Sequence, residues 1–109
     1  FEILKKQIKD SIEKKFNLKK IFITYEPIWS IGTNKILKSK DLKETFVFIK
    51  KFYKRNFKTK FAPITLYGGS VNEINISKFR LINEIDGFLI GGASQSSKKF
   101  IDIIKNYYK

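Results

Sequence analysis

The 109-residue sequence contains no cysteine and no histidine. The absence of cysteine excludes disulfides and thiolate metal ligands, and the absence of histidine also removes the usual zinc sites and the serine–histidine–aspartate triad. No apolar run is long enough to cross a bilayer, and the sequence around Phe1 does not resemble a signal peptide. We therefore expect a soluble, cytoplasmic protein with no membrane partner.

Acidic residues are also scarce. The sequence has 10 Asp and Glu and 23 Lys and Arg, which gives a net charge of +13. Such an excess is typical of nucleic-acid-binding proteins. However, the only arginines are Arg55 and Arg80, although arginine is the better reader of phosphates and base edges. We therefore favour a solvated lysine-rich surface with no nucleic-acid partner. A lysine-rich nucleic-acid-binding module remains the alternative function.

What the sequence does contain is an alternation of helical and strand patterns. Apolar residues at helical spacing predict helices over residues 1–18, from 39 or 41 to 55, over 72–82, and from 96 or 97 to the end. Short apolar runs predict strands at 21–24, 64–67 and 88–90. This order predicts one α/β domain with parallel strands and right-handed crossovers. The pattern alone does not separate a barrel from an open doubly wound sheet.

The same spacing predicts which side chains of two helices face the core. In the second helix they are Leu42, Phe46, Ile49 and Tyr53, and in the last helix they are Phe100, Ile101 and Ile104. Ser96 or Ser97 is expected to cap the last helix, and Asn17 is expected to end the first.

The most informative stretch begins with the predicted strand at 21–24 and reaches Lys35. Glu26 follows the strand, and Pro27 then stiffens the chain. A largely apolar segment comes next and ends at Gly32 and Asn34, which both tolerate positive φ. This arrangement predicts a lid hinged beside a catalytic carboxylate, whereas without the flanking residues Glu26 would read as a solvated acid.

Three segments carry a resemblance to a known family. Residues 25–33, Tyr-Glu-Pro-Ile-Trp-Ser-Ile-Gly-Thr, resemble the lid sequence of the triosephosphate isomerases, and 66–72 and 86–94 match that family in the same order. The resemblance implies that residues 1–109 form the C-terminal part of a (β/α)8 TIM barrel, from the helix before the sixth strand through the final helix. That part comprises three parallel strands and four helices, with the barrel incomplete. Because the sequence starts at Phe1 and has no Met, we expect a fragment.

The resemblance also implies an activity. The family interconverts dihydroxyacetone phosphate and D-glyceraldehyde 3-phosphate as a homodimer, without a metal or another cofactor. Glu26 would be the base, and closing the lid would remove water from its carboxylate and make it more basic. The family also uses an Asn and a Lys from the first strand and a His from the fourth. Since those strands are absent here, we expect this chain alone to be inactive.

The resemblance assigns the remaining site residues as well. The lid would comprise Pro27, Ile28, Trp29, Ser30, Ile31, Gly32, Thr33, Asn34 and Lys35, and it would be latched by Tyr67 and the hydroxyl of Ser70. Backbone groups of Gly32, Ser70, Gly91 and Gly92 would hold the substrate phosphate. Consecutive glycines by themselves predict either an anion nest or two tight turns that need glycine for packing. A different phosphate-binding barrel enzyme would share these glycine turns but not the lid.

Overall fold

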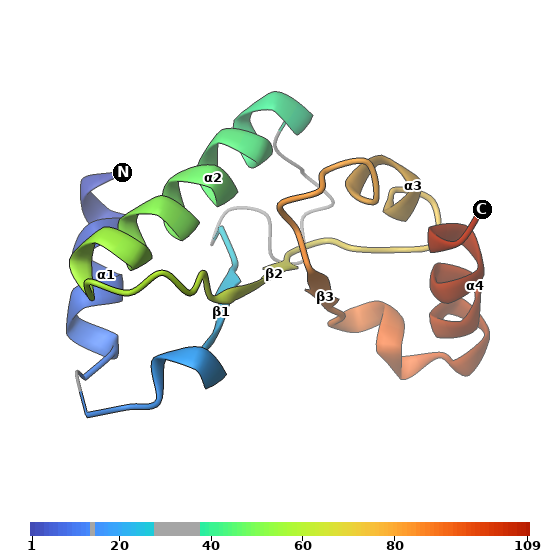
Figure 1. Cartoon of the computed structure of the whole chain (residues 1–109). Helices are drawn as coiled ribbons and strands as arrows, with labels where there is room; N and C mark the ends of the chain where they lie inside the picture. The colour runs from blue at the N-terminus through green and yellow to red at the C-terminus, as the bar shows by residue number, and fades with distance from the viewer. Residues whose placement is uncertain (14, 28–37) are drawn as a thin grey trace.

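The computed structural model describes residues 1–13, 15–27 and 38–109. Three strands lie at the centre of Figure 1, with the two N-terminal helices to their left and the two C-terminal helices to their right. The helices are α1 (Glu2–Ser11), α2 (Ser39–Asn56), α3 (Ile76–Phe79) and α4 (Ser97–Tyr107), and the strands are β1 (Phe22–Tyr25), β2 (Ile64–Gly68) and β3 (Gly87–Leu89). Two short 3-10 helices, η1 (Leu18–Lys20) and η3 (Gly92–Gln95), precede β1 and α4.

The three strands form a parallel sheet in the order β1-β2-β3. Tyr25 of β1 is opposite Tyr67 of β2, and Gly68 at the end of β2 is opposite Leu89 of β3. Because all three strands run the same way, the segments that leave their carboxyl ends gather at one edge of the sheet. Those segments contain Glu26, the turn at 69–70 and the turn at 91–92, so the topology brings the three predicted site elements to one edge.

The core lies on the face of the sheet that the helices cover. Its fully buried members include Phe46 of α2, Tyr67 of β2 and Phe79 of α3, and Ile103 of α4 extends the same cluster. A second cluster, centred on Ile8, joins α1 to α2 and β1. On the other face, Phe22, Ile64 and Leu89 remain 40–61% exposed. The described sheet is therefore covered on one face only.

The prediction of which side chains are buried was correct for α2 and wrong for α4. All four residues predicted to be buried in α2, Leu42, Phe46, Ile49 and Tyr53, are at most 1% exposed, so that prediction is confirmed. The prediction for α4 was wrong, since Ile103 is the buried residue and Phe100, Ile101 and Ile104 are 38–49% exposed. The reason is that α4 packs against α3 and η3, and its apolar face is wider than the core that it contacts. Phe100 and Ile104 instead line a groove beside β3.

The first helix is shorter than predicted. It ends at Ser11 and Ile12 is extended, whereas the apolar spacing predicted a helix to Leu18. Asn17 does not end this helix but caps η1, where its side chain accepts a hydrogen bond from the amide of Lys19. The chain turns early because η1 is tied to α2, where the Tyr53 hydroxyl donates to the carbonyl of Leu18. Tertiary contact thus overrides local helical spacing here.

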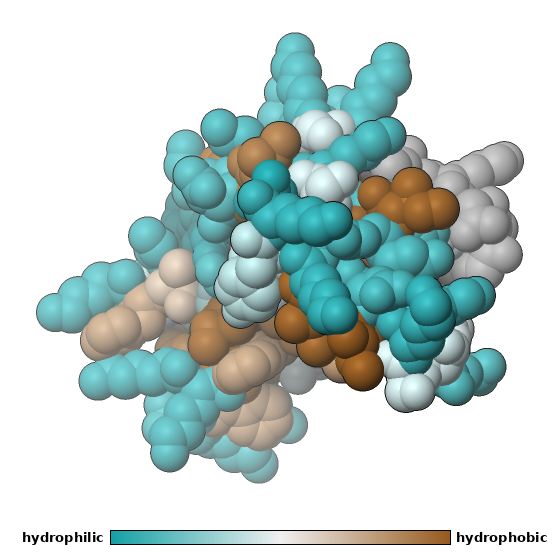
Figure 2. Space-filling view, turned by 90° about the vertical axis from the view of Figure 1, so that its right-hand side faces the viewer, coloured by the Kyte–Doolittle hydropathy of each residue, from teal (hydrophilic) through white to brown (hydrophobic). Residues whose placement is uncertain are grey.

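The surface on the α3–α4 side is mostly hydrophilic, with apolar patches between the polar side chains (Figure 2). Large apolar residues are exposed on this part of the chain, including Ile74, Leu81 and Ile101. Of the helices that the structure describes, none combines the length and apolar character that crossing a membrane requires.

Candidate functional site

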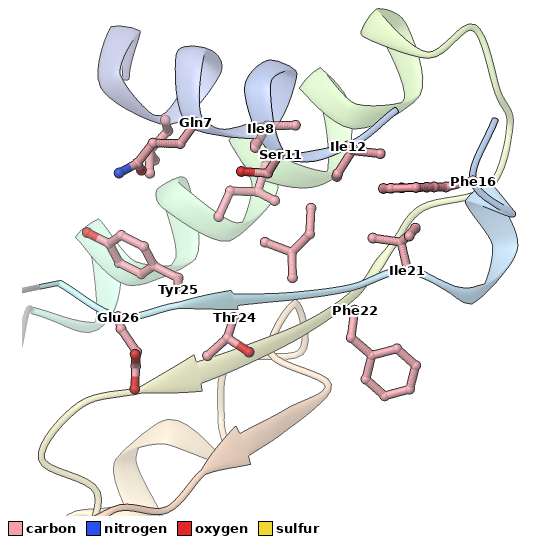
Figure 3. Close-up of a pocket in the computed structure, with 13 residues that line it drawn as sticks. Gln7, Ile8, Ser11, Ile12, Phe16, Ile21, Phe22, Thr24, Tyr25 and Glu26 are labelled. Atoms are coloured by element: carbon pink, nitrogen blue, oxygen red, sulfur yellow. The ribbon is translucent and has the colours of Figure 1, made fainter. Parts of the chain in front are cut away.

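Glu26 follows directly on β1, and the alternation of the strand determines where its side chain points. Tyr25 points towards α1 and α2, whereas Thr24 and Glu26 point to the opposite face of the sheet (Figure 3). The Glu26 side chain is exposed on that face, at the carboxyl end of the strand. This is the face and the end of the sheet at which barrel enzymes place their reacting groups.

The Glu26 carboxylate lies against the end of the neighbouring strand. A β-carbon built on Gly68 would be 2.5 Å from Glu26 Cγ and 2.7 Å from Glu26 Oε1, which is closer than real atoms approach. The register explains this contact, since the pair Tyr25–Tyr67 is followed along the two strands by Glu26 and Gly68. Glycine at position 68 therefore leaves the space that the carboxylate occupies.

The predicted lid falls largely outside the described residues. Pro27, its first residue, is described and buried. Ile28 to Lys35, and with them the predicted phosphate contact at Gly32, lie outside the part of the chain that the structure describes.

Tyr67, one of the two predicted latch residues, lies deep in the core. It is fully buried, and its ring contacts Phe46 and Phe79 at centroid distances of 6.5 and 4.7 Å. These contacts fix its ring next to the turn that follows β2. The predicted bond between Tyr67 and the lid stays a prediction, because Pro27 is the one lid residue that the structure describes.

The two predicted phosphate turns border one cavity. A cavity of about 260 Å³ is lined by Gly69 and Ser70 from the turn after β2 and by Gly92 and Ala93 from the turn after β3. Gly68, the residue in contact with Glu26, directly precedes this turn, so the carboxylate and the cavity lie at the same edge of the sheet. Gly91 belongs to the second turn but does not line the cavity itself.

The surroundings of the glycines bear on the two interpretations of the second turn, whereas Gly68 beside the first turn is explained by packing against Glu26. At Gly87 a β-carbon would lie 2.9 Å from Leu66 Cδ2, so packing explains that glycine. At Gly91 and Gly92 a β-carbon would meet no atom within 4 Å. The absence of side chains there leaves the backbone open to a ligand, and the packing interpretation finds no support at this turn.

Two asparagines hold the turn after β2 in shape. The side chain of Asn72 accepts hydrogen bonds from the amides of Ile74 and Asn75, each at 2.9 Å. In return, Asn75 Oδ1 accepts from the amide of Asn72 at 2.9 Å, and Asn75 Nδ2 donates to the carbonyl of Ser70. This reciprocal arrangement resembles a capping box and fixes the backbone on one side of the cavity.

Residues that sequence reasoning missed also surround the cavity. Lys99 of α4 and Glu73 of the loop after β2 line it, and Asn75 supports its wall. The spacing of Asn72 and Asn75 offered a signal for the wall, but nothing in the sequence distinguishes Lys99 from the other lysines. In the described part of the chain, no three acidic side chains gather in a way that would hold a metal ion.

Comparison with known proteins adds an independent line of argument. The family model for triosephosphate isomerase matches residues 1–107. The triosephosphate isomerase of Dictyoglomus thermophilum is 41% identical over 109 residues, which cover 96% of this chain and 44% of that protein. The enzyme of Dictyostelium discoideum is 43% identical over 89 residues, covering 80% of this chain and 35% of that protein.

The structural comparison agrees. The crystal structure of triosephosphate isomerase from Bartonella henselae superposes with a TM-score of 0.80 at 31% sequence identity, covering 99% of this chain and 44% of that one. The expected fold, an incomplete barrel with three parallel strands and four helices, is thereby confirmed. The chain spans less than half the length of these relatives. Its sequence, its sheet and the glycine turns at one edge of that sheet make it a member of the triosephosphate isomerase family.

Proposed function

We propose that these 109 residues supply the catalytic base and most of the phosphate site of a triosephosphate isomerase. They correspond, on this proposal, to the part of the barrel from the helix before the sixth strand through the last helix. The complete enzyme interconverts dihydroxyacetone phosphate and D-glyceraldehyde 3-phosphate. The observation that carries the proposal is the contact between Glu26 and Gly68, one residue before the turn that lines the cavity.

Glu26 acts as the base in this proposal. It takes a proton from one of two adjacent carbons of the substrate and returns it to the other, through an enediol or enediolate. Glutamate-based proton transfer is the established chemistry of this family and not a deduction from this chain. What the geometry contributes is the position of the carboxylate, which is fixed by the end of β1 and accommodated by Gly68.

The cavity between the two glycine turns holds the phosphate group. The proposed donors are the backbone amides of Ser70 and Gly92, which line the cavity, of Gly91 directly beside it, and of Gly32 in the lid. Exposed amides suit an oxyanion because they donate hydrogen bonds and carry no side chain that would block a close approach. Glu26 contacts Gly68, the residue directly before the turn that lines the cavity, so the proposed base and the proposed phosphate site are neighbours, as a three-carbon substrate with a phosphate at one end requires.

Water exclusion is the role that we assign to the segment 27–35. Its apolar residues Ile28, Trp29 and Ile31 would cover the reacting carbons, and Tyr67 and the Ser70 hydroxyl would hold it closed. The need is chemical, because an enediolate beside a phosphate ester eliminates phosphate when it is exposed to water.

A chimera tests the proposal. The part of the Dictyoglomus thermophilum enzyme that this chain does not match is fused to residues 1–109, and isomerisation is followed in both directions. We expect activity that falls by a factor of roughly 10²–10⁴ in Glu26→Gln, since that is the usual contribution of a general base. Glu44→Gln, which changes an exposed glutamate on α2, serves as the control and should leave the rate unchanged.

The 109-residue chain by itself should show no turnover. Family members need a Lys and a His from earlier strands, and this sequence contains no histidine. Isomerisation by the chain alone at the rate of the chimera would contradict this, and a folded chimera in which Glu26→Gln is fully active would contradict the role of Glu26.

We further infer a homodimer in the cytoplasm for the complete enzyme. Both inferences rest on the family resemblance. Light scattering of the chimera measures the oligomeric state, and a monomer at micromolar concentration would contradict the first inference. Imaging of the tagged natural protein tests the second, which an organellar signal would contradict.

A further inference from the structure

The cavity between the glycine turns contains two side chains of opposite charge that the proposed function does not use. Lys99 and Glu73 line it together with Gly69, Ser70 and Gly92. Both side chains add to the backbone amides that are the proposed phosphate donors. The positive charge of Lys99 attracts an anion, and the negative charge of Glu73 repels it.

Lys99 is held at the cavity by the start of α4. Ser96 caps this helix, and its hydroxyl oxygen accepts a hydrogen bond from the amide of Lys99 at 3.3 Å. The neighbouring Lys98 forms an ion pair with Asp102 at 2.9 Å, whereas Lys99 forms none with any acidic residue that the structure describes. Lys99 is thus a lysine at this edge whose ammonium is not held in an ion pair by a described residue.

Glu73 lines the same cavity. Its Oε2 is buried and accepts no hydrogen bond from any described residue. The carbonyl of the same residue accepts a hydrogen bond from Asn106 of α4, so the backbone that carries this carboxylate is tied to the last helix. A carboxylate in this position repels a bound phosphate.

We propose that Lys99 binds the phosphate group of the substrate directly, and that Glu73 weakens the same interaction. This inference rests on the proposed function and assigns two further residues to its phosphate site. The lysine contributes as a mobile point charge, which suits a phosphate that is already positioned by backbone amides. The carboxylate limits the affinity, so that the strength of phosphate binding is set by the balance between two side chains.

Binding of inorganic phosphate to the chimera that carries these 109 residues tests the inference without any need for catalysis. The amide resonances of Gly69, Ser70 and Gly92 are followed in a ¹⁵N-labelled sample during a phosphate titration. We expect Lys99→Gln to weaken binding by roughly tenfold or more, which is the loss typical for a hydrogen bond to a charged group. Glu73→Gln should strengthen binding, and Lys99→Arg should retain most of it.

The matched control is Lys105→Gln, which removes the same charge from an exposed lysine near the other end of α4 that does not line the cavity. Its binding should stay within about twofold of the unchanged chain, because exposed charges are screened over short distances in physiological salt. Equal weakening by Lys105→Gln and Lys99→Gln would show that only the net charge matters and would overturn the inference. Normal binding by Lys99→Gln would overturn it as well but leave the proposed function intact. Absence of phosphate binding at these amides in the unchanged chain would contradict the proposed phosphate site itself.

Discussion

The carboxylate of Glu26 occupies the space that any side chain at position 68 would fill. The closest approach would be 2.5 Å, between a β-carbon on residue 68 and Glu26 Cγ. The two residues come from different strands and follow a register pair of tyrosines. The position of the proposed base is therefore coupled to the identity of one residue on the neighbouring strand.

This coupling leads to a first prediction. Gly68→Ala should displace the Glu26 side chain and destabilise the chain by about 1 kcal/mol, in the range of mild overpacking. In a Glu26→Ala background the same substitution should be neutral or stabilising by about 0.5 kcal/mol. The clash with the Glu26 side chain is then absent, and alanine lowers the conformational entropy of the unfolded chain relative to glycine. Urea unfolding of the four proteins measures the coupling. Equal effects in both backgrounds would show that the two residues are independent.

Much of the fold could be predicted from the sequence, because the local residue pattern of most elements agrees with the structure that they adopt. The three strands lie within two residues of their predicted bounds, and α2 buries its predicted residues because it packs along its length onto the sheet. The errors occurred where the outcome depended on distant contacts. Whether a residue of α4 is buried depends on how far the core extends beneath the helix, and apolar spacing carries no information about this.

The candidate site was predictable in part for the same reason. Glu26 and the glycine turns stand at strand ends, and parallel strands bring their carboxyl ends together. Lys99 was not predictable, since the sequence contains many similar lysines and only the packing of α4 decides which one reaches the cavity. The need for glycine at position 68 was also not predictable, because Glu26, the residue that a side chain there would meet, is 42 positions away in the sequence.

Asn75 should be important for the wall of the cavity. Its side chain joins the carbonyl of Ser70 to the amide of Asn72. Asn75→Ala removes both hydrogen bonds and should lower the free energy of unfolding by about 1 kcal/mol or more, because the partly buried groups left behind lose their partners. Phosphate binding should weaken with it. Asn83→Ala, which changes an exposed asparagine, is the control for urea unfolding, and a similar loss in both variants would refute the role of Asn75.

Ser96 should stabilise the helix that carries Lys99. Its hydroxyl oxygen caps α4, and Ser97, the next residue, begins the helix without that bond. Ser96→Ala should cost about 0.5–2 kcal/mol, as is usual for the loss of a capping side chain. Ser97→Ala should have little effect. Thermal unfolding of the two variants decides the matter, and a larger loss in Ser97→Ala would mean that the cap lies elsewhere.

The last prediction concerns the opposite end of the sheet, where one carboxylate joins three elements. Asp86 Oδ2, just before β3, accepts hydrogen bonds of 2.8 Å from the Thr65 amide of β2 and from Lys50 Nζ of α2, and a longer one from the Thr65 hydroxyl. Burial acts to raise the pKa of Asp86, but the hydrogen bonds from Lys50 and Thr65 and the charge of Lys50 outweigh it, so that the pKa lies below its usual value.

A lowered carboxylate pKa stabilises the folded chain above the pKa of the unfolded state, about 4, and this stabilisation disappears as the pH falls through the folded value. Asp86→Asn should therefore be less stable than the unchanged chain at pH 7, and the difference should shrink when both are unfolded in urea at pH 3. Comparing the two proteins cancels the contribution of Asp102, whose pKa is also lowered by its hydrogen bond from Lys98. If the difference were the same at both pH values, the charge of Asp86 would not contribute to holding β2, β3 and α2 together.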